Sequence, residues 1–87
     1  MNNDIENLKK RLIYRSQYRG TKEMDKLIGS FVDANINKFD YKDLLKLEKF
    51  LNIDDDTLYK FYTNQIILDE FNNSKVTKLF KNYEYKK

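Results

Sequence analysis

The sequence predicts an all-α fold, a small bundle-like single domain over residues 1–87 with about five short helices. Apolar residues recur at three- and four-residue intervals along each stretch, the spacing of one helix face. No stretch alternates apolar and polar residues as a half-buried strand would, and no internal repeat appears. The 87 residues include two glycines and no proline, so few residues interrupt helices.

The first helix is predicted from Ile5, Leu8 and Leu12, which share one face at i, i+3 and i+7. Gly20 is expected to end it, because glycine adopts the left-handed backbone conformation that commonly closes a helix.

The second helix is expected to open at Gly20 or Thr21 and carries the clearest amphipathic pattern of the chain. Gly29 interrupts this pattern at a cost of roughly 1 kcal/mol relative to alanine. We therefore expect another helix to cross closely at Gly29. The apolar face consists of Met24, Leu27, Ile28, Phe31 and Val32.

Aspartates mark the next two helix starts. Asp40 is predicted to cap a third helix over residues 41–51, and one aspartate of residues 54–56 is predicted to cap a short fourth helix. The last helix has two candidate starts, one near Asp69 and one after Ser74.

The composition argues against an enzyme. Cysteine and histidine are both absent, which excludes disulfides, thiolate ligands and the commonest general base. We expect no catalytic residue and no metal site. The acidic residues 54–56 could be read as a divalent-cation site, but the twelve-residue calcium loop is missing and helix capping is favoured.

The net charge of +3 is unevenly distributed. Residues 1–22 and 74–87 each carry +4, whereas residues 23–73 carry −5. This division favours solvated ends over a single basic face for nucleic acid. With no basic, apolar leader and no apolar run of about 18 residues, we expect a cytosolic protein without a membrane span.

The segment from Arg19 through Gly20 to Glu23 has two interpretations. As architecture, Gly20 caps a helix and Glu23 faces Arg19 across the turn. As an interaction site, glycine allows a partner's backbone to approach, and arginine offers a planar fork of donors. The only arginines are Arg11, Arg15 and Arg19, along one face leading to this turn. That restriction favours the interaction site, with arginine geometry serving a partner.

Residues 12–25, which read LIYRSQYRGTKEMD, resemble the succinate dehydrogenase assembly factor family of SdhE-like flavinylation factors. The hallmark of that family is R-G-x-x-E after a first helix that bears leucine and tyrosine. The acidic stretch and short aromatic helix at residues 54–62, and the Val-x-x-Leu-Phe pattern at residues 76–80, are also similar. One departure is the absence of the proline often found after the fourth helix.

The resemblance implies an assembly chaperone that binds the flavoprotein subunit of succinate dehydrogenase, or of the related fumarate reductase, and promotes covalent attachment of FAD to it. FAD then belongs to the partner, and this chain binds no cofactor stably. The resemblance further implies a monomer when free, in a bacterial cytoplasm. It places partner contacts at the hallmark positions Arg19, Gly20 and Glu23, and from the flanking pattern at Tyr14, Ser16 and Asp25.

A small helical nucleic-acid-binding module is the alternative function. It would need a recognition helix with polar and basic side chains after a short turn. The second helix instead begins with Glu23 and Asp25, which would repel phosphates.

Overall fold

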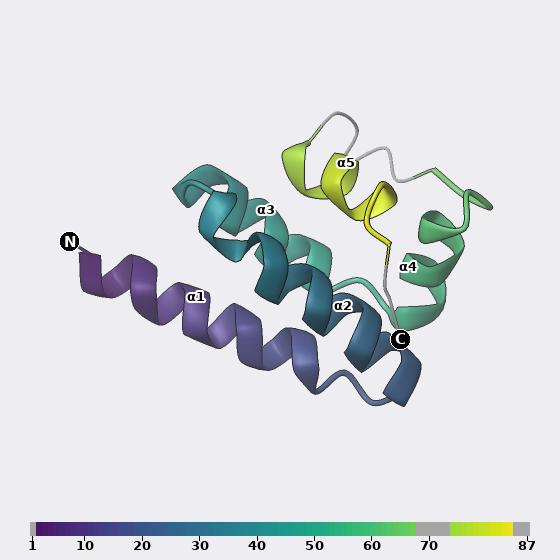
Figure 1. Cartoon of the computed structure of the whole chain (residues 1–87), viewed down its shortest axis with the longest axis horizontal. Coiled ribbons are helices and arrows are strands. Elements are labelled where there is room, and N and C mark those ends of the chain that lie inside the picture. Colours follow the sequence, from purple (N-terminus) through teal and green to yellow (C-terminus); the bar gives the residue numbers. More distant parts are fainter. Residues whose placement is uncertain (1, 68–73, 85–87) are drawn as a thin grey trace.

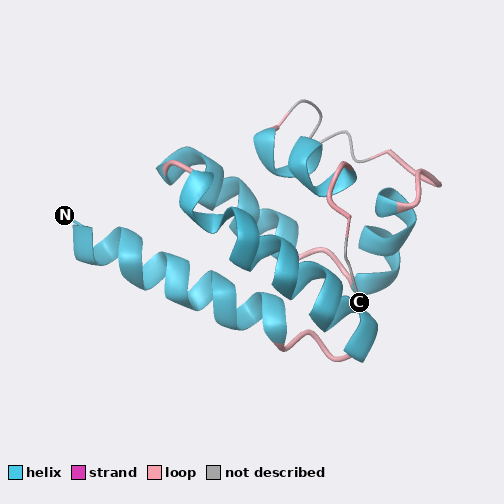
Figure 2. Ribbon diagram, in the orientation of Figure 1, coloured by secondary structure: helices cyan, strands magenta, loops and turns pink. Residues whose placement is uncertain are grey.

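The computed structural model describes residues 2–67 and 74–84, and within them the chain is helical with no strand (Figures 1 and 2). The predicted all-α fold is therefore confirmed. The elements are α1 (Asn2–Gln17), α2 (Lys22–Asn35), the short 3-10 helix η1 (Ile36–Lys38), α3 (Tyr41–Leu51), α4 (Asp55–Tyr62) and α5 (Lys75–Lys81).

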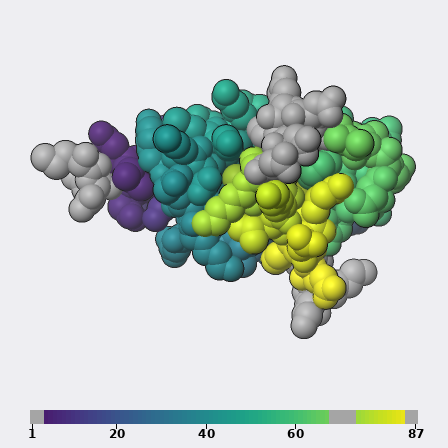
Figure 3. All heavy atoms as spheres, turned by 90° about the horizontal axis from the view of Figure 1, so that it is seen from above, coloured from purple at the N-terminus to yellow at the C-terminus, as the bar shows by residue number. Residues whose placement is uncertain are grey.

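The two longest helices, α1 and α2, lie side by side and run in opposite directions (Figure 1). After η1 turns the chain, α3 packs against α1 and α5. Figure 3 shows α5 and the residues after it lying between the middle of the chain and α4. In this packing, the connection between α3 and α4 lies close to the connection between α1 and α2.

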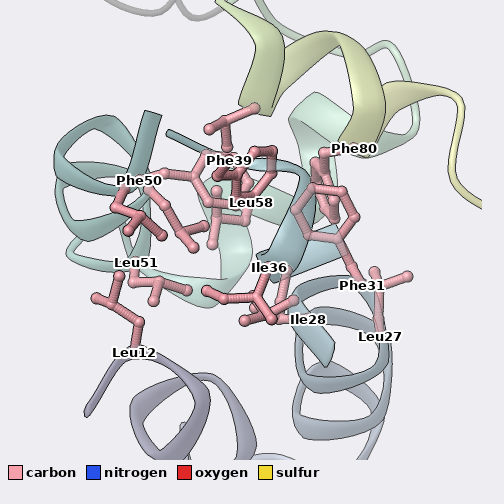
Figure 4. Close-up of a cluster of buried hydrophobic side chains, with 14 of the residues drawn as sticks. Leu12, Leu27, Ile28, Phe31, Ile36, Phe39, Phe50, Leu51, Leu58 and Phe80 are labelled. Atoms are coloured by element: carbon pink, nitrogen blue, oxygen red, sulfur yellow. The ribbon is translucent and has the colours of Figure 1, made fainter. Parts of the chain in front are cut away.

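An aromatic cluster from three helices forms the centre of the core. The Phe80 ring lies 5.1 Å from that of Phe31 and 5.0 Å from that of Phe50, measured between centroids, and all three side chains are fully buried (Figure 4). These edge-to-face contacts bring α2, α3 and α5 together. The other residues buried around them include Leu12, Ile28, Val32, Leu44, Leu47, Leu58 and Val76.

The close helix crossing predicted at Gly29 is confirmed. A β-carbon at Gly29 would lie 3.1 Å from the Gln17 Cγ and 3.5 Å from the Ser16 carbonyl oxygen. Glycine therefore lets α2 approach the last turn of α1, and this contact sets where the chain leaves α1.

Side-chain caps begin four of the helices, because the first N–H groups of a helix have no partner within it. Asp40 and Asp54 accept N–H donations three residues along, which confirms the predicted caps of α3 and α4. Thr21 caps α2, and Ser74 caps α5. The start predicted after Ser74 is thus confirmed, whereas the alternative near Asp69 lies outside the described residues.

The cap at Asp54 also affects its ionisation. The Thr57 hydroxyl and the Thr57 N–H donate hydrogen bonds that hold the pKa of the exposed Asp54 carboxyl below its ordinary value.

Over the described ranges, no helix is both long enough and apolar enough to cross a membrane.

Candidate functional site

The connection between α1 and α2 holds the R-G sequence, and residues 18–21 are here called the Arg-Gly loop. The helix α1 ends at Gln17, three residues before the end expected at Gly20. Gly20 has a φ of 125°, a conformation that side-chain-bearing residues rarely adopt. Thr21 follows and starts α2 by accepting a hydrogen bond from the Met24 N–H.

Asp25 explains why α1 stops early. Its Oδ1 accepts the Arg19 N–H at 2.6 Å and the Gly20 N–H at 3.3 Å. These amides bond to the start of α2 and leave the path of α1, so Asp25 holds the backbone of the Arg-Gly loop from one side.

The Arg19 side chain holds the loop from the other side. Its Nε donates to Asp55 Oδ1 at 2.6 Å, and its two terminal nitrogens donate to the Leu51 carbonyl, at 2.8 Å, and to the Ile53 carbonyl. Only 8% of the Arg19 side chain is exposed, beside 23% for Asp55.

The sequence predicts an arginine at the surface that faces Glu23. In this structure the Arg19 side chain is instead buried and does not pair with Glu23. The carbonyls at the end of α3 lack partners within the helix, and the arginine fork satisfies them and pairs with Asp55. The ion pair of Arg19 is with α4, not with Glu23.

Arg11 and Arg15 also bond across to the end of α3. Arg11 donates to Glu48 Oε2 at 3.1 Å, and Arg15 donates to the Asn52 side chain. In this conformation each arginine of the row has an acceptor within the chain, and a role of the row toward a partner stays a prediction. The row of Arg11, Arg15 and Arg19 fastens α1 and its loop to residues 48–55.

The other predicted site residues divide into exposed and buried groups. Gly20 and Glu23 are exposed, and within the described part of the chain Glu23 has no hydrogen bond or ion pair. Ser16 is fully buried, and its hydroxyl donates to the Ile13 carbonyl at 2.7 Å. Ser16 therefore presents no surface to a partner in this conformation.

An exposed aromatic pair lies next to the Arg-Gly loop. The Tyr14 and Tyr18 rings contact each other at a tilt of 34° with centroids 4.6 Å apart, although 64% and 68% of these residues are exposed. A shallow depression beside the pair continues to Ile53 and Asp54. Two large exposed aromatics next to a side-chain-free glycine form a surface suited to protein contact.

The acidic residues of the site are engaged in caps and hydrogen bonds. Among the described residues, no group of three or more carboxylates could hold a metal ion. Asp55 is the ion-pair partner of Arg19 that the sequence did not single out, because it was one of three consecutive aspartates with equal claims as a cap. The sequence held no signal for this pairing, because a buried arginine requires a carboxylate or several carbonyls nearby but nothing local shows that Arg19 is buried.

Comparison with known protein families agrees with this geometry. The model of the family described as "flavinator of succinate dehydrogenase" matches residues 10–84, a range that includes the Arg-Gly loop and the residues that accept its hydrogen bonds, Asp25, Leu51, Ile53 and Asp55. The chain belongs to this family. The matched range begins within α1 and runs past α5. The family match therefore covers nearly the whole fold as well as the R-G-x-x-E segment.

Curated relatives of this flavinator-family chain carry matching names. It is 31% identical over 80 residues to succinate dehydrogenase assembly factor 2, mitochondrial, of Dictyostelium discoideum, covering 92% of this chain and 57% of the relative. It is 36% identical over 62 residues to FAD assembly factor SdhE of Acetobacter pasteurianus, covering 71% and 57%. With the mitochondrial assembly factor 2 of Arabidopsis thaliana, identity is 38% over 55 residues, covering 63% and 29%.

The chain thus spans little more than half the length of two of these relatives and less than a third of the other. No solved structure matches the chain significantly.

Proposed function

We propose that this flavinator-family protein binds the flavoprotein subunit of succinate dehydrogenase, or of a related fumarate reductase, and promotes covalent attachment of FAD to that subunit. Membership of the family supports the assembly role, and the names of the relatives support FAD as the group being assembled. The lack of histidine and cysteine supports a helper that is not itself an enzyme.

The observation that carries the proposal is the exposure of Gly20, on a loop whose backbone is fixed by internal bonds, and of Glu23, in the first turn of α2 directly after that loop. An immobilised loop loses little conformational entropy on binding, so more of the contact energy appears as affinity. The unpaired Glu23 carboxylate suits a basic or hydrogen-bond-donating group on the partner.

The proposed mechanism is conformational. The flavin and its acceptor histidine belong to the partner subunit, and they react when held in the correct relative position. A helper accelerates this by binding the competent arrangement more tightly than other arrangements. Tyr14, Gly20 and Glu23 are the proposed contacts, whereas Arg19, Ser16 and Asp25 contribute by shaping the surface that carries them.

The test is co-expression of this chain with a candidate flavoprotein subunit, followed by a denaturing gel on which covalent flavin is measured by fluorescence. The wild-type chain is expected to raise the flavin signal of the subunit. Glu23→Gln keeps an acceptor oxygen but removes the negative charge, and it is expected to weaken subunit binding roughly tenfold, because a hydrogen bond to a charged group is stronger than one to a neutral group. An equal flavin signal with and without the chain would refute the proposal.

Asp33→Asn is the matched control, because Asp33 is an exposed acid on the same helix, nearly three turns from Glu23. It should leave both binding and flavin signal at the wild-type level. Equal losses for Asp33→Asn and Glu23→Gln would place the partner contact elsewhere on the protein.

The remaining parts of the proposal concern state and place. We propose a free monomer that holds no FAD of its own, working in a bacterial cytoplasm. Light scattering of the purified chain, its flavin absorbance and cell fractionation check these three points. The names of the plant and slime-mould relatives say mitochondrial, so a mitochondrial fraction is the competing result.

A further inference from the structure

The Arg-Gly loop is held by two carboxylates from two different helices. Asp25 of α2 accepts the backbone N–H groups of Arg19 and Gly20. Asp55, in the first turn of α4, accepts the Arg19 Nε through one oxygen, while its other oxygen lies 3.5 Å from the Thr21 hydroxyl.

Asp55 therefore bonds to residues on both sides of Gly20. Arg19 precedes the glycine, and Thr21, which follows it, is also the cap that starts α2. Gly20 has a φ of 125° in this structure, and a glycine in a loop that nothing else holds can adopt many other conformations. Fixing its two neighbours removes most of that freedom.

The geometry points to Asp55 as a positioning residue, which keeps the Arg-Gly loop in the shape that presents Gly20 and Glu23 to the partner. This inference rests on the proposed function. It means that Arg19 serves the site through Asp55 and the α3 carbonyls, and that an aspartate 36 positions away is as necessary as the arginine itself.

The burial of the Arg19–Asp55 ion pair strengthens the hold of Asp55 on the Arg-Gly loop. With 8% of Arg19 and 23% of Asp55 exposed, water screens their attraction only partly. Removing Asp55 leaves a mostly buried guanidinium with carbonyl partners alone, so the arginine is expected to move toward solvent. The loop would then be released on its α4 side.

Asp55→Ala is the principal variant, and two controls are available within the chain. Asp56→Ala removes the neighbouring acid of the same first turn, which is exposed and pairs with Lys60 at 3.1 Å. Glu48→Ala breaks the bridge to Arg11, which joins α1 to α3 away from the loop. These controls separate loop positioning from the loss of charge and of helix fastening.

The first measurement is the flavin signal of the co-expressed flavoprotein subunit, together with subunit binding by the purified variants. Asp55→Ala is expected to weaken binding about tenfold or more, which equals 1.4 kcal/mol. Asp55→Asn, which keeps the acceptor for Arg19 Nε, is expected to recover part of the loss. Asp56→Ala and Glu48→Ala should stay near wild type. Wild-type binding by Asp55→Ala, or equal losses in all three alanine variants, would overturn the inference.

The second measurement is amide hydrogen exchange at Arg19 and Gly20 in the free protein, which requires no partner. Asp55→Ala should accelerate exchange at these two amides while the amides of α3 stay protected. Unchanged exchange would overturn the inference. If the wild-type chain fails to promote flavin attachment, the proposed function fails, and the exchange result still decides whether Asp55 positions the loop.

Discussion

At the scale of single residues, the site depends on which groups already have partners. Arg19 has the strongest donors in the loop, and each of its three guanidinium nitrogens donates a hydrogen bond within the chain. Glu23 has an ordinary exposed carboxylate with no such bond among the described residues. The partner surface is therefore expected at Gly20 and Glu23, with Arg19 acting behind it.

Gly20 allows backbone strain to be separated from contact with a partner. No atom lies within 4 Å of a β-carbon built at Gly20, so Gly20→Ala and Gly20→Glu should share only the cost of φ 125°, about 1–3 kcal/mol. Thermal unfolding should give similar losses for both variants. Subunit binding should fall further for Gly20→Glu, because a charged side chain enters the contact.

Equal binding by Gly20→Ala and Gly20→Glu would contradict a partner contact at this glycine. Neither variant is expected to keep the full stability of the wild type, since every side-chain-bearing residue incurs some strain at this φ.

At the scale of elements, α1 is attached to the rest of the protein in two ways. Its apolar face contributes Leu8 and Leu12 to the core, and its polar edge contributes the arginines that bond to the end of α3. The three arginines and their acceptors follow the same order along the chain. The polar attachment therefore fixes the direction of α1 relative to the end of α3. Helix α1 therefore cannot shift by a turn without losing its polar partners.

The α1–α2 crossing predicts the effects of substitutions at Gly29. In Gly29→Ala, a gain in helix propensity of about 1 kcal/mol opposes the 3.1 Å contact with Gln17, so stability should change by less than about 1 kcal/mol. In Gly29→Val, overpacking should cost about 1–3 kcal/mol. Urea denaturation measures both changes.

Asp33→Val controls for a β-branched side chain in α2, since Asp33 is exposed on the same helix. A loss in Asp33→Val as large as that in Gly29→Val would assign the effect to valine anywhere in α2 rather than to the crossing.

At the scale of the whole molecule, one core supports every described α-helix. The Phe80 ring from α5 contacts rings from α2, α3 and α4, including that of Tyr62 with centroids 5.0 Å apart. The helix α5 is only seven residues long, too short to be stable by itself. Its order therefore depends on this cluster, and the cluster depends on it.

Phe80→Ala should accordingly destabilise the entire fold by about 3–5 kcal/mol. This is a large part of the roughly 5–15 kcal/mol that stabilises a small protein. Amide exchange in α1 should accelerate together with exchange in α5, because the unfolding is cooperative. Lys78→Ala, at an exposed position of α5, should leave exchange unchanged. Acceleration confined to α5 would show that this helix unfolds separately.

The sequence by itself determined the helices, most of their caps and the face that each one buries. Periodic apolar residues and the aspartates and serine at the caps act over three or four positions, so their consequences are local and can be read in order. Two further features could be read from short stretches in the same way: the close crossing at Gly29 and the R-G-x-x-E segment as a candidate site.

Only the tertiary structure decided what Arg19 does. Its acceptors at residues 51, 53 and 55 lie more than thirty positions away, and no local pattern distinguishes a buried arginine from an exposed one. The packing of α1 against α3 brings these groups together, and it converts the expected surface arginine into an internal support for Gly20 and Glu23.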